Sequence, residues 1–101
     1  MLVIVLGSSQ AWGDHLTWMP AEWKCCDHGD CFASQVTLKN ESQRLVEIGN
    51  REVQLEETTR LGPSLEYQVG YVCFRDTHKP SWELLIAPEN LRCVFYRAGG
   101  G

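Results

Sequence analysis

The sequence lacks a long hydrophobic run, an excess of positive charge and a recognisable catalytic or cofactor motif. Its longest apolar run ends at Leu6, far short of the roughly 20 residues that a transmembrane helix needs, so a membrane span is excluded. The formal net charge is −4. Because no basic stripe is present to displace counterions from phosphates, nucleic acid is not an expected partner.

Groups that could perform acid–base or nucleophilic chemistry are also scarce. Such chemistry needs a nucleophile, a base and an orienting group that converge in space. The histidines, His15, His28 and His78, fall in segments that we expect to be loops, and no serine or cysteine is flanked by the residues of a nucleophile turn. We therefore expect a protein without enzymatic activity.

Cysteine, in contrast, is abundant for a chain of 101 residues. Three of the five cysteines lie within residues 25–31, which we call the cysteine segment. A domain of this size buries a modest core and benefits from covalent cross-links, so the cysteines predict a disulfide framework. Its candidate members are Cys25, Cys26, Cys31, Cys73 and Cys93.

Several pairings of these cysteines are open. We favour a bond between Cys73 and Cys93, which closes a loop of about 20 residues and contributes roughly 3 kcal/mol in the chain-entropy model. Cys31 would then pair with Cys25 or Cys26. A competing arrangement sends Cys73 and Cys93 separately to the cysteine segment. The unpaired cysteine would form an intermolecular bond or serve as a reactive group.

The alternative use of the cysteine segment is zinc binding. Cys25, Cys26, His28 and Cys31 offer thiolate and imidazole ligands within one loop. Structural zinc sites, however, take ligand pairs from different segments, and adjacent cysteines seldom bind one ion, so disulfides without a cofactor are favoured. The absence of a C-x-x-C pair argues against a redox-active dithiol.

The first 13 residues resemble the end of a secretory signal. An apolar run over residues 2–6 precedes small residues at Ala11 and Gly13, which predicts cleavage before Asp14. A basic leading region is missing and the run is short, and the alternative is that residues 2–6 form a buried edge strand.

The remainder has no internal repeat or linker, which predicts one domain over residues 14–97. The glycine-rich tail, residues 98–101, is expected to be flexible.

Alternating apolar and polar residues predict a chain of strands. The expected strands cover residues 34–38, 44–48, 51–55, 65–74 and 91–96, with residues 82–86 continuing the series. Gly49 and Asn50 predict a hairpin turn in which Val46 faces Val53. We choose residues 65–74 as the central strand.

These elements predict a mostly β fold, either a small twisted antiparallel sheet or an open barrel, stabilised by disulfides. Pro20 can begin a helical turn over residues 20–24, which would lead into the cysteine segment. Trp18, Trp23 and Trp82 are candidates for an aromatic binding surface. The alternative for Trp18 and Trp23 is that they lie across the domain as a strap and cover a small core.

The pattern resembles a group of small exported bacterial proteins of uncharacterised function. In that group a His-x-Trp-Tyr-Pro lead precedes Cys-Cys-x-x-x-Asp-Cys and a late Arg-Cys-aromatic strand. The matching residues here are His15, Trp18, Pro20, Cys25, Cys26, Asp30, Cys31, Cys73 and residues 92–95, with Met19 in place of the usual tyrosine. The resemblance implies export to the periplasm or the extracellular space, a compact cysteine-tied domain and no established enzyme chemistry.

Two functions follow from this sequence. The first is a non-enzymatic exported domain that binds a protein partner, as an accessory or structural subunit of an extracytoplasmic or particle assembly. The second is a small zinc-binding protein that uses the cysteine segment.

Overall fold

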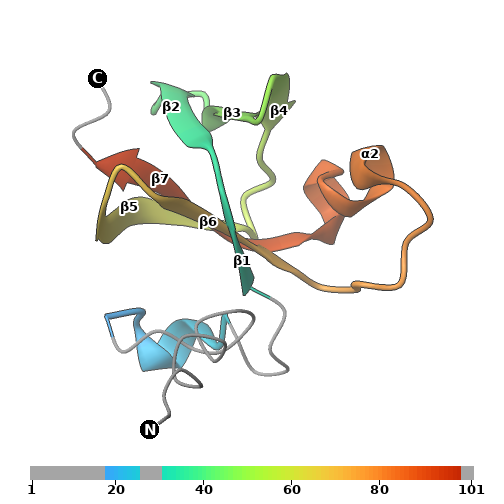
Figure 1. Cartoon of the computed structure of the whole chain (residues 1–101), viewed down its shortest axis with the longest axis horizontal. Helices are drawn as coiled ribbons and strands as arrows, with labels where there is room; N and C mark the ends of the chain where they lie inside the picture. Colours follow the sequence, from blue (N-terminus) through green and yellow to red (C-terminus); the bar gives the residue numbers. More distant parts are fainter. Residues whose placement is uncertain (1–17, 26–30, 99–101) are drawn as a thin grey trace, which may run out of the picture.

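The computed structural model describes residues 18–25 and 31–98 (Figure 1). Strands dominate these ranges, with short helical turns at the start and before the last strand. In chain order the elements are η1 (Ala21–Trp23), β1 (Cys31–Ser34), β2 (Val36–Asn40), β3 (Leu45–Ile48), β4 (Arg51–Gln54), β5 (Arg60–Tyr67), β6 (Gly70–Phe74), α2 (Trp82–Leu85), η2 (Pro88–Asn90) and β7 (Leu91–Ala98).

The strands form two sheets. One has the order β1-β6-β7-β5 and the other the order β2-β3-β4. Neighbouring strands are antiparallel, except that β5 and β7 run parallel. The expected fold class is confirmed: the domain is small, mostly β and disulfide-tied, with the short helical turn η1 near its start. The two sheets do not close into a barrel.

The predicted hairpin is confirmed in its turn and its register. β3 and β4 are joined by Gly49 and Asn50, with Val46 opposite Val53 and Glu47 opposite Glu52. Gly49 has a φ of +65°, the left-handed conformation that glycine adopts without a steric penalty. The valine face is buried, and the glutamate face carries the exposed Glu52.

Two of the expected strands are each divided. Residues 34–38 are interrupted at Gln35, where the chain leaves β1 in one sheet and enters β2 in the other. Residues 65–74 are interrupted by a tight turn in which Gln68 has a φ of +64° and the N–H of Val69 donates to the carbonyl of Glu66. The prediction of one long central strand was therefore wrong, because side-chain alternation continues across the turn. Of the two resulting strands, β6 lies in the interior of the sheet, beside β7, whereas β5 lies at its edge.

Residues 82–86 do not form a strand. Ser81 caps a short helix, α2, by accepting a hydrogen bond from the backbone N–H of Leu84 at 3.2 Å. A serine cap with an acidic residue in the first turn, here Glu83, is a common helix start. The run was too short for its periodicity to distinguish a helix from a strand.

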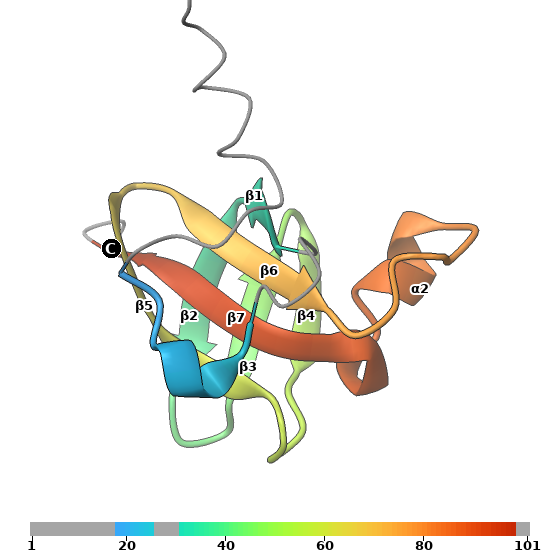
Figure 2. The same cartoon turned by 90° about the horizontal axis from the view of Figure 1, so that it is seen from below.

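Buried side chains lie on both faces of the four-stranded sheet. The larger cluster fills the space between the two sheets and includes Val36, Ile48, Val72 and Val94. Figure 2 shows the three-stranded sheet behind β6 and β7, and residues 18–25 in front of β5 and β7. On that second face residues 18–25 cover a smaller cluster, which contains the bonded cysteines. Alternate residues of β6 thus serve two cores.

Candidate functional site

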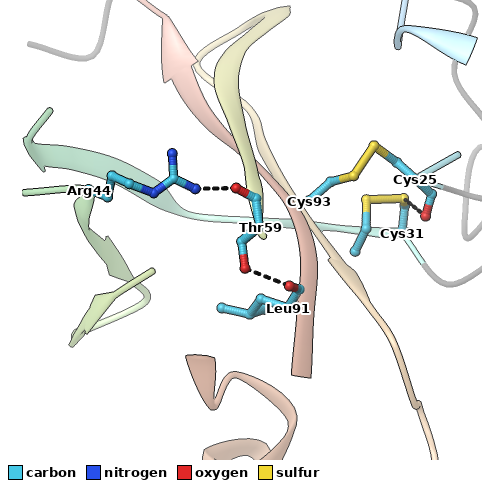
Figure 3. Close-up of a disulfide and its surroundings, with 7 residues drawn as sticks. Cys25, Cys31, Arg44, Thr59, Leu91 and Cys93 are labelled. Atoms are coloured by element: carbon cyan, nitrogen blue, oxygen red, sulfur yellow. Dashed lines mark hydrogen bonds between the residues drawn. A yellow bond between two sulfur atoms is a disulfide. The ribbon is translucent and has the colours of Figure 1, made fainter. Parts of the chain in front are cut away.

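The disulfides lie on a row of cysteines that crosses three adjacent strands. Cys31 of β1 is opposite Cys73 of β6, and Cys73 is opposite Cys93 of β7. Cys25, which follows η1, approaches the same row (Figure 3). Cys25 is bonded to Cys93 and Cys31 is bonded to Cys73, and each cysteine is at most 3% exposed.

The favoured pairing of Cys73 with Cys93 was therefore wrong, and the competing arrangement is the one observed. Cys73 and Cys93 are buried neighbours, as expected, but each is bonded to a cysteine of residues 25–31. The pairing depends on β1 lying beside β6 and on residues 18–25 crossing the sheet, and spacing along the chain reveals neither. Cys26 lies outside the described residues.

The structure does not bring the expected zinc ligands of the cysteine segment together as free ligands in the described residues. The sulfurs of Cys25 and Cys31 are both held in disulfides, and a disulfide sulfur is not the thiolate that zinc requires. Cys26, His28 and His15 lie outside the described residues. His78 lies on an exposed loop, where its side chain is 94% exposed and its Nδ1 is 3.5 Å from Oδ1 of Asp76.

Trp18 and Trp23 pack on the cysteine-containing core. Trp18 meets Phe95 edge to face with ring centroids 5.0 Å apart, and Trp23 stacks on Phe95 at 5.7 Å. The guanidinium of Arg60 lies 5.9 Å from the Trp23 ring centroid, and Gly62 is beneath the same ring. Residues 18–25 thus form a strap across β5 and β7. The disulfide between Cys25 and Cys93 ties this strap to the sheet.

A polar cluster fastens the start of this strap. Glu66 accepts a hydrogen bond from the hydroxyl of Tyr71 at 2.7 Å and another from the indole N–H of Trp18 at 3.4 Å. Burial raises the pKa of Tyr71 to about 12, and the hydrogen bond to Glu66 and the charge of Glu66 act in the same direction. Tyr71 therefore stays a neutral donor throughout the physiological range.

Trp82 lies apart from these tryptophans and borders an open apolar hollow. Its ring meets Phe74 edge to face at 6.3 Å, and Phe74 also contacts Phe32 at 5.8 Å. The hollow has a volume of about 300 Å³ and is lined by Phe32, Ala33, Phe74, Thr77, Trp82 and Leu85. Phe32 and Trp82 are 37% and 47% exposed, although both are large hydrophobic residues.

A buried asparagine holds the loop and the helix that border this hollow. The side-chain amide of Asn90 donates to the carbonyls of Asp76 and Leu85, at 2.9 and 3.0 Å, and its oxygen accepts from the N–H of Asp76 at 3.0 Å. The N–H of His78 donates to the Asp76 carboxylate and holds its pKa below the ordinary value. These hydrogen bonds position Thr77 and α2 at the border of the hollow, beside Phe74.

The hollow lies beside the outer edge of β1, which ends the four-stranded sheet in the described part of the chain. The Cα atoms of Cys31 and Cys73 are 4.0 Å apart, the short spacing of an antiparallel pair that exchanges no backbone hydrogen bonds. Ala33 and Tyr71, two residues along the ladder, form a pair of the same kind. The N–H and C=O of Ala33 therefore point away from β6, toward the outer edge.

Sequence reasoning identified Trp82 as a candidate binding residue and missed Phe32 and Phe74. The three aromatic residues come from β1, β6 and α2, and no local pattern shows that these segments meet. The one feature of the sequence that could have indicated the hollow is Phe32, an aromatic residue directly after Cys31. The acidic residues Glu47 and Glu52 lie on the hairpin and do not line the hollow.

Comparisons with protein-family models, with curated proteins and with solved structures found no match to this chain. The resemblance to small exported bacterial proteins therefore stays a prediction. Two disulfides are typical of proteins from oxidising, extracytoplasmic compartments. Among the described residues, no helix has the length and apolar character to cross a membrane.

Proposed function

We propose that this chain is an exported, non-enzymatic binding domain, acting as an accessory or structural subunit of an extracytoplasmic assembly. The observation that carries this proposal is the aromatic hollow beside the outer edge of β1. Large exposed apolar side chains that gather around a depression are typical of a binding site.

The partner we propose is an extended protein segment that carries an aromatic or large aliphatic side chain. The outward backbone groups of Ala33 offer hydrogen bonds to an added strand, and such strand addition is a common mode of peptide recognition. Phe32 and Trp82 would then contact the apolar side chain of the segment, with Phe74 as the floor of the hollow.

Selection of a displayed peptide library on the purified chain, with its disulfides intact, tests this proposal. Enriched peptides should contain a strand-forming segment with an apolar anchor. Their affinity should fall by about tenfold or more in Phe32→Ser and in Trp82→Ser, since aromatic anchors dominate such interfaces. Leu65→Ser is the matched control, because Leu65 is an exposed hydrophobic residue of β5 that does not line the hollow.

Three outcomes would contradict the proposal. The library could yield no binder, or Leu65→Ser could weaken binding as much as Phe32→Ser does. Alternatively, sedimentation could show a dimer that Phe32→Ser dissociates, in which case a second copy covers the hollow.

Export is tested separately. When the chain is produced behind a complete export signal, N-terminal sequencing should find a mature protein that begins at or near Asp14. An exported protein that retains residues 2–6 would contradict cleavage at this position.

A further inference from the structure

Four buried sulfur atoms from distant parts of the chain meet at one place on the sheet. The sulfurs of Cys25, Cys73 and Cys93 all lie within 4.8 Å of one another, and the sulfur of Cys31 is bonded to that of Cys73. The Cys31 sulfur is also 3.3 Å from the carbonyl oxygen of Cys25, a contact without a proton while the disulfide is intact. Figure 3 shows the two disulfides side by side.

We propose that the reduced chain binds one zinc ion through the four thiolates of Cys25, Cys31, Cys73 and Cys93. The same cysteines would thus hold the fold together in two ways, as two disulfides under oxidising conditions and as a zinc centre after reduction. This ligand set differs from the one expected from the sequence, which used the cysteine segment alone.

The backbone places the four cysteines close to one another. Four thiolates bound to zinc at about 2.3 Å lie about 3.8 Å from one another. Three of the four cysteines are cross-strand neighbours on one face of the sheet, and Cys25 approaches them from the strap. We expect side-chain rotation on reduction to bring the sulfur of Cys31 to tetrahedral spacing with the other three, while β1, β6 and β7 keep their register.

The surroundings also suit a closed, four-coordinate zinc. All four cysteines are buried, so water would not occupy a ligand position as it does in catalytic zinc sites. Four thiolates leave a net charge of −2 around a Zn²⁺ ion. Arg60, which is paired in register with Cys93 and extends over Trp23 on the same face, offers a nearby compensating charge.

The conversion balances with a dithiol as the reductant. Each disulfide takes up two electrons and two protons and becomes two thiols, while one dithiol is oxidised to its cyclic disulfide. Two equivalents of dithiol therefore convert Cys25–Cys93 and Cys31–Cys73 into four thiols. Binding of Zn²⁺ then displaces the four thiol protons, so affinity should rise with pH.

The experiment is a titration of the reduced full chain with Co²⁺, a spectroscopic substitute for zinc, followed by displacement with Zn²⁺. A thiol assay first confirms reduction. We expect one Co²⁺ per chain, with the charge-transfer and d–d absorption of tetrahedral thiolate coordination, and no such absorption from the oxidised chain. Circular dichroism should show that Zn²⁺ preserves or restores the β signal of the reduced chain.

Paired variants distinguish the two ligand sets. Cys73→Ser and Cys93→Ser should each abolish the tetrahedral absorption, whereas Cys26→Ser and His28→Ala should keep it. If Cys26→Ser and His28→Ala abolish it and Cys73→Ser does not, the ion is bound by the cysteine segment and the proposal is overturned. It is also overturned if the fully reduced chain gives no thiolate absorption with Co²⁺, whether or not that chain is folded, because bound zinc should itself restore the fold.

Discussion

At the scale of single residues, the fold requires glycine at positions 49 and 70, for different reasons. Gly49 has a left-handed backbone and open space where a Cβ would be. Gly70 does not have a left-handed backbone, but there is no space for a side chain. A Cβ there would lie 2.8 Å from the carbonyl oxygen of Phe95 and 2.9 Å from Cβ of Val36. At Gly70 the obstacle is the backbone of β7 together with the facing sheet.

We therefore expect Gly70→Ala to destabilise the protein more than Gly49→Ala does. Gly49→Ala should lower the free energy of unfolding by about 1 kcal/mol, the penalty for a left-handed alanine. Gly70→Ala should lower it by about 2 to 3 kcal/mol, because strands must separate to admit the methyl group. Urea unfolding with the disulfides intact measures both, and equal values would contradict this account of Gly70.

Ionisation of Tyr71 should make the free energy of unfolding depend on pH in the alkaline range. Its pKa is about 12 in the folded state and about 10 when unfolded. Below pH 10 both states are protonated and the pH has no effect through this group. Between these two values the unfolded state loses its proton first, so the free energy of unfolding falls as the pH rises.

The test is urea unfolding of the wild type and Tyr71→Phe from about pH 9 to about pH 11. The variant should be less stable at pH 9, since Glu66 loses a hydrogen-bond donor, and its stability should fall less steeply above pH 10. Parallel curves for the two proteins would show that Tyr71 ionises equally easily in both states.

At the scale of elements, Asn90 joins three parts of the chain. It lies at the end of η2 and binds the polar loop after β6 and the C-terminal end of α2. The backbone carbonyl of Asn90 also accepts from the N–H of Arg75 at 2.8 Å. The loop and helix that border the aromatic hollow thus depend on one buried amide, which is 5% exposed.

Asn90→Asp should be more harmful than Asn90→Ala, although it is closer in shape. Alanine leaves buried backbone groups without partners and should cost about 1 to 3 kcal/mol. Aspartate places an oxygen against the carbonyls of Asp76 and Leu85, which are acceptors themselves, so repulsion adds to the loss. Thermal unfolding at neutral pH compares the two variants, and an Asn90→Asp protein as stable as wild type would contradict these contacts.

A pair of hydrogen bonds links the two sheets. The Arg44 guanidinium donates to the carbonyl of Thr59, and the buried hydroxyl of Thr59 donates to the carbonyl of Leu91 at 2.8 Å (Figure 3). Arg44 precedes β3, Thr59 precedes β5 and Leu91 begins β7. The turn that leads into β3, the central strand of the three-stranded sheet, is thereby fixed to the start of β5, an edge strand of the four-stranded sheet.

At the scale of the whole molecule, the two disulfides are nested. Cys31–Cys73 spans 42 residues and lies within the 68-residue span of Cys25–Cys93. In the chain-entropy model the contribution of a cross-link depends only on the logarithm of loop length, which gives about 4 kcal/mol for each bond. That is a large share of the 5–15 kcal/mol by which domains are ordinarily stable.

We expect removal of the two bonds to have unequal structural effects. Cys25→Ser with Cys93→Ser should release the strap, which Trp18 and Trp23 fluorescence would report. Cys31→Ser with Cys73→Ser should loosen β1 and with it the aromatic hollow. Each pair should lower the melting temperature by roughly 15 to 30 °C. A melting temperature within a few degrees of wild type would contradict the assigned bond.

The sequence by itself determined the class of the fold and its most local features. Gly49 and Asn50 dictated the hairpin and its register, because turn conformation and strand alternation are properties of neighbouring residues. Pro20 and the residues after it predicted the helical turn η1, and the cysteine content predicted disulfides.

Only the tertiary structure decided which segments meet. The disulfide pairing follows from β1 lying beside β6 and from the strap crossing β7, and the hollow combines Phe32, Phe74 and Trp82 from three separate elements. Even the division of residues 65–74 depends on β7 lying between β5 and β6. Side-chain alternation identifies the two faces of a strand, but the neighbour of each strand is chosen by the packing of the whole chain.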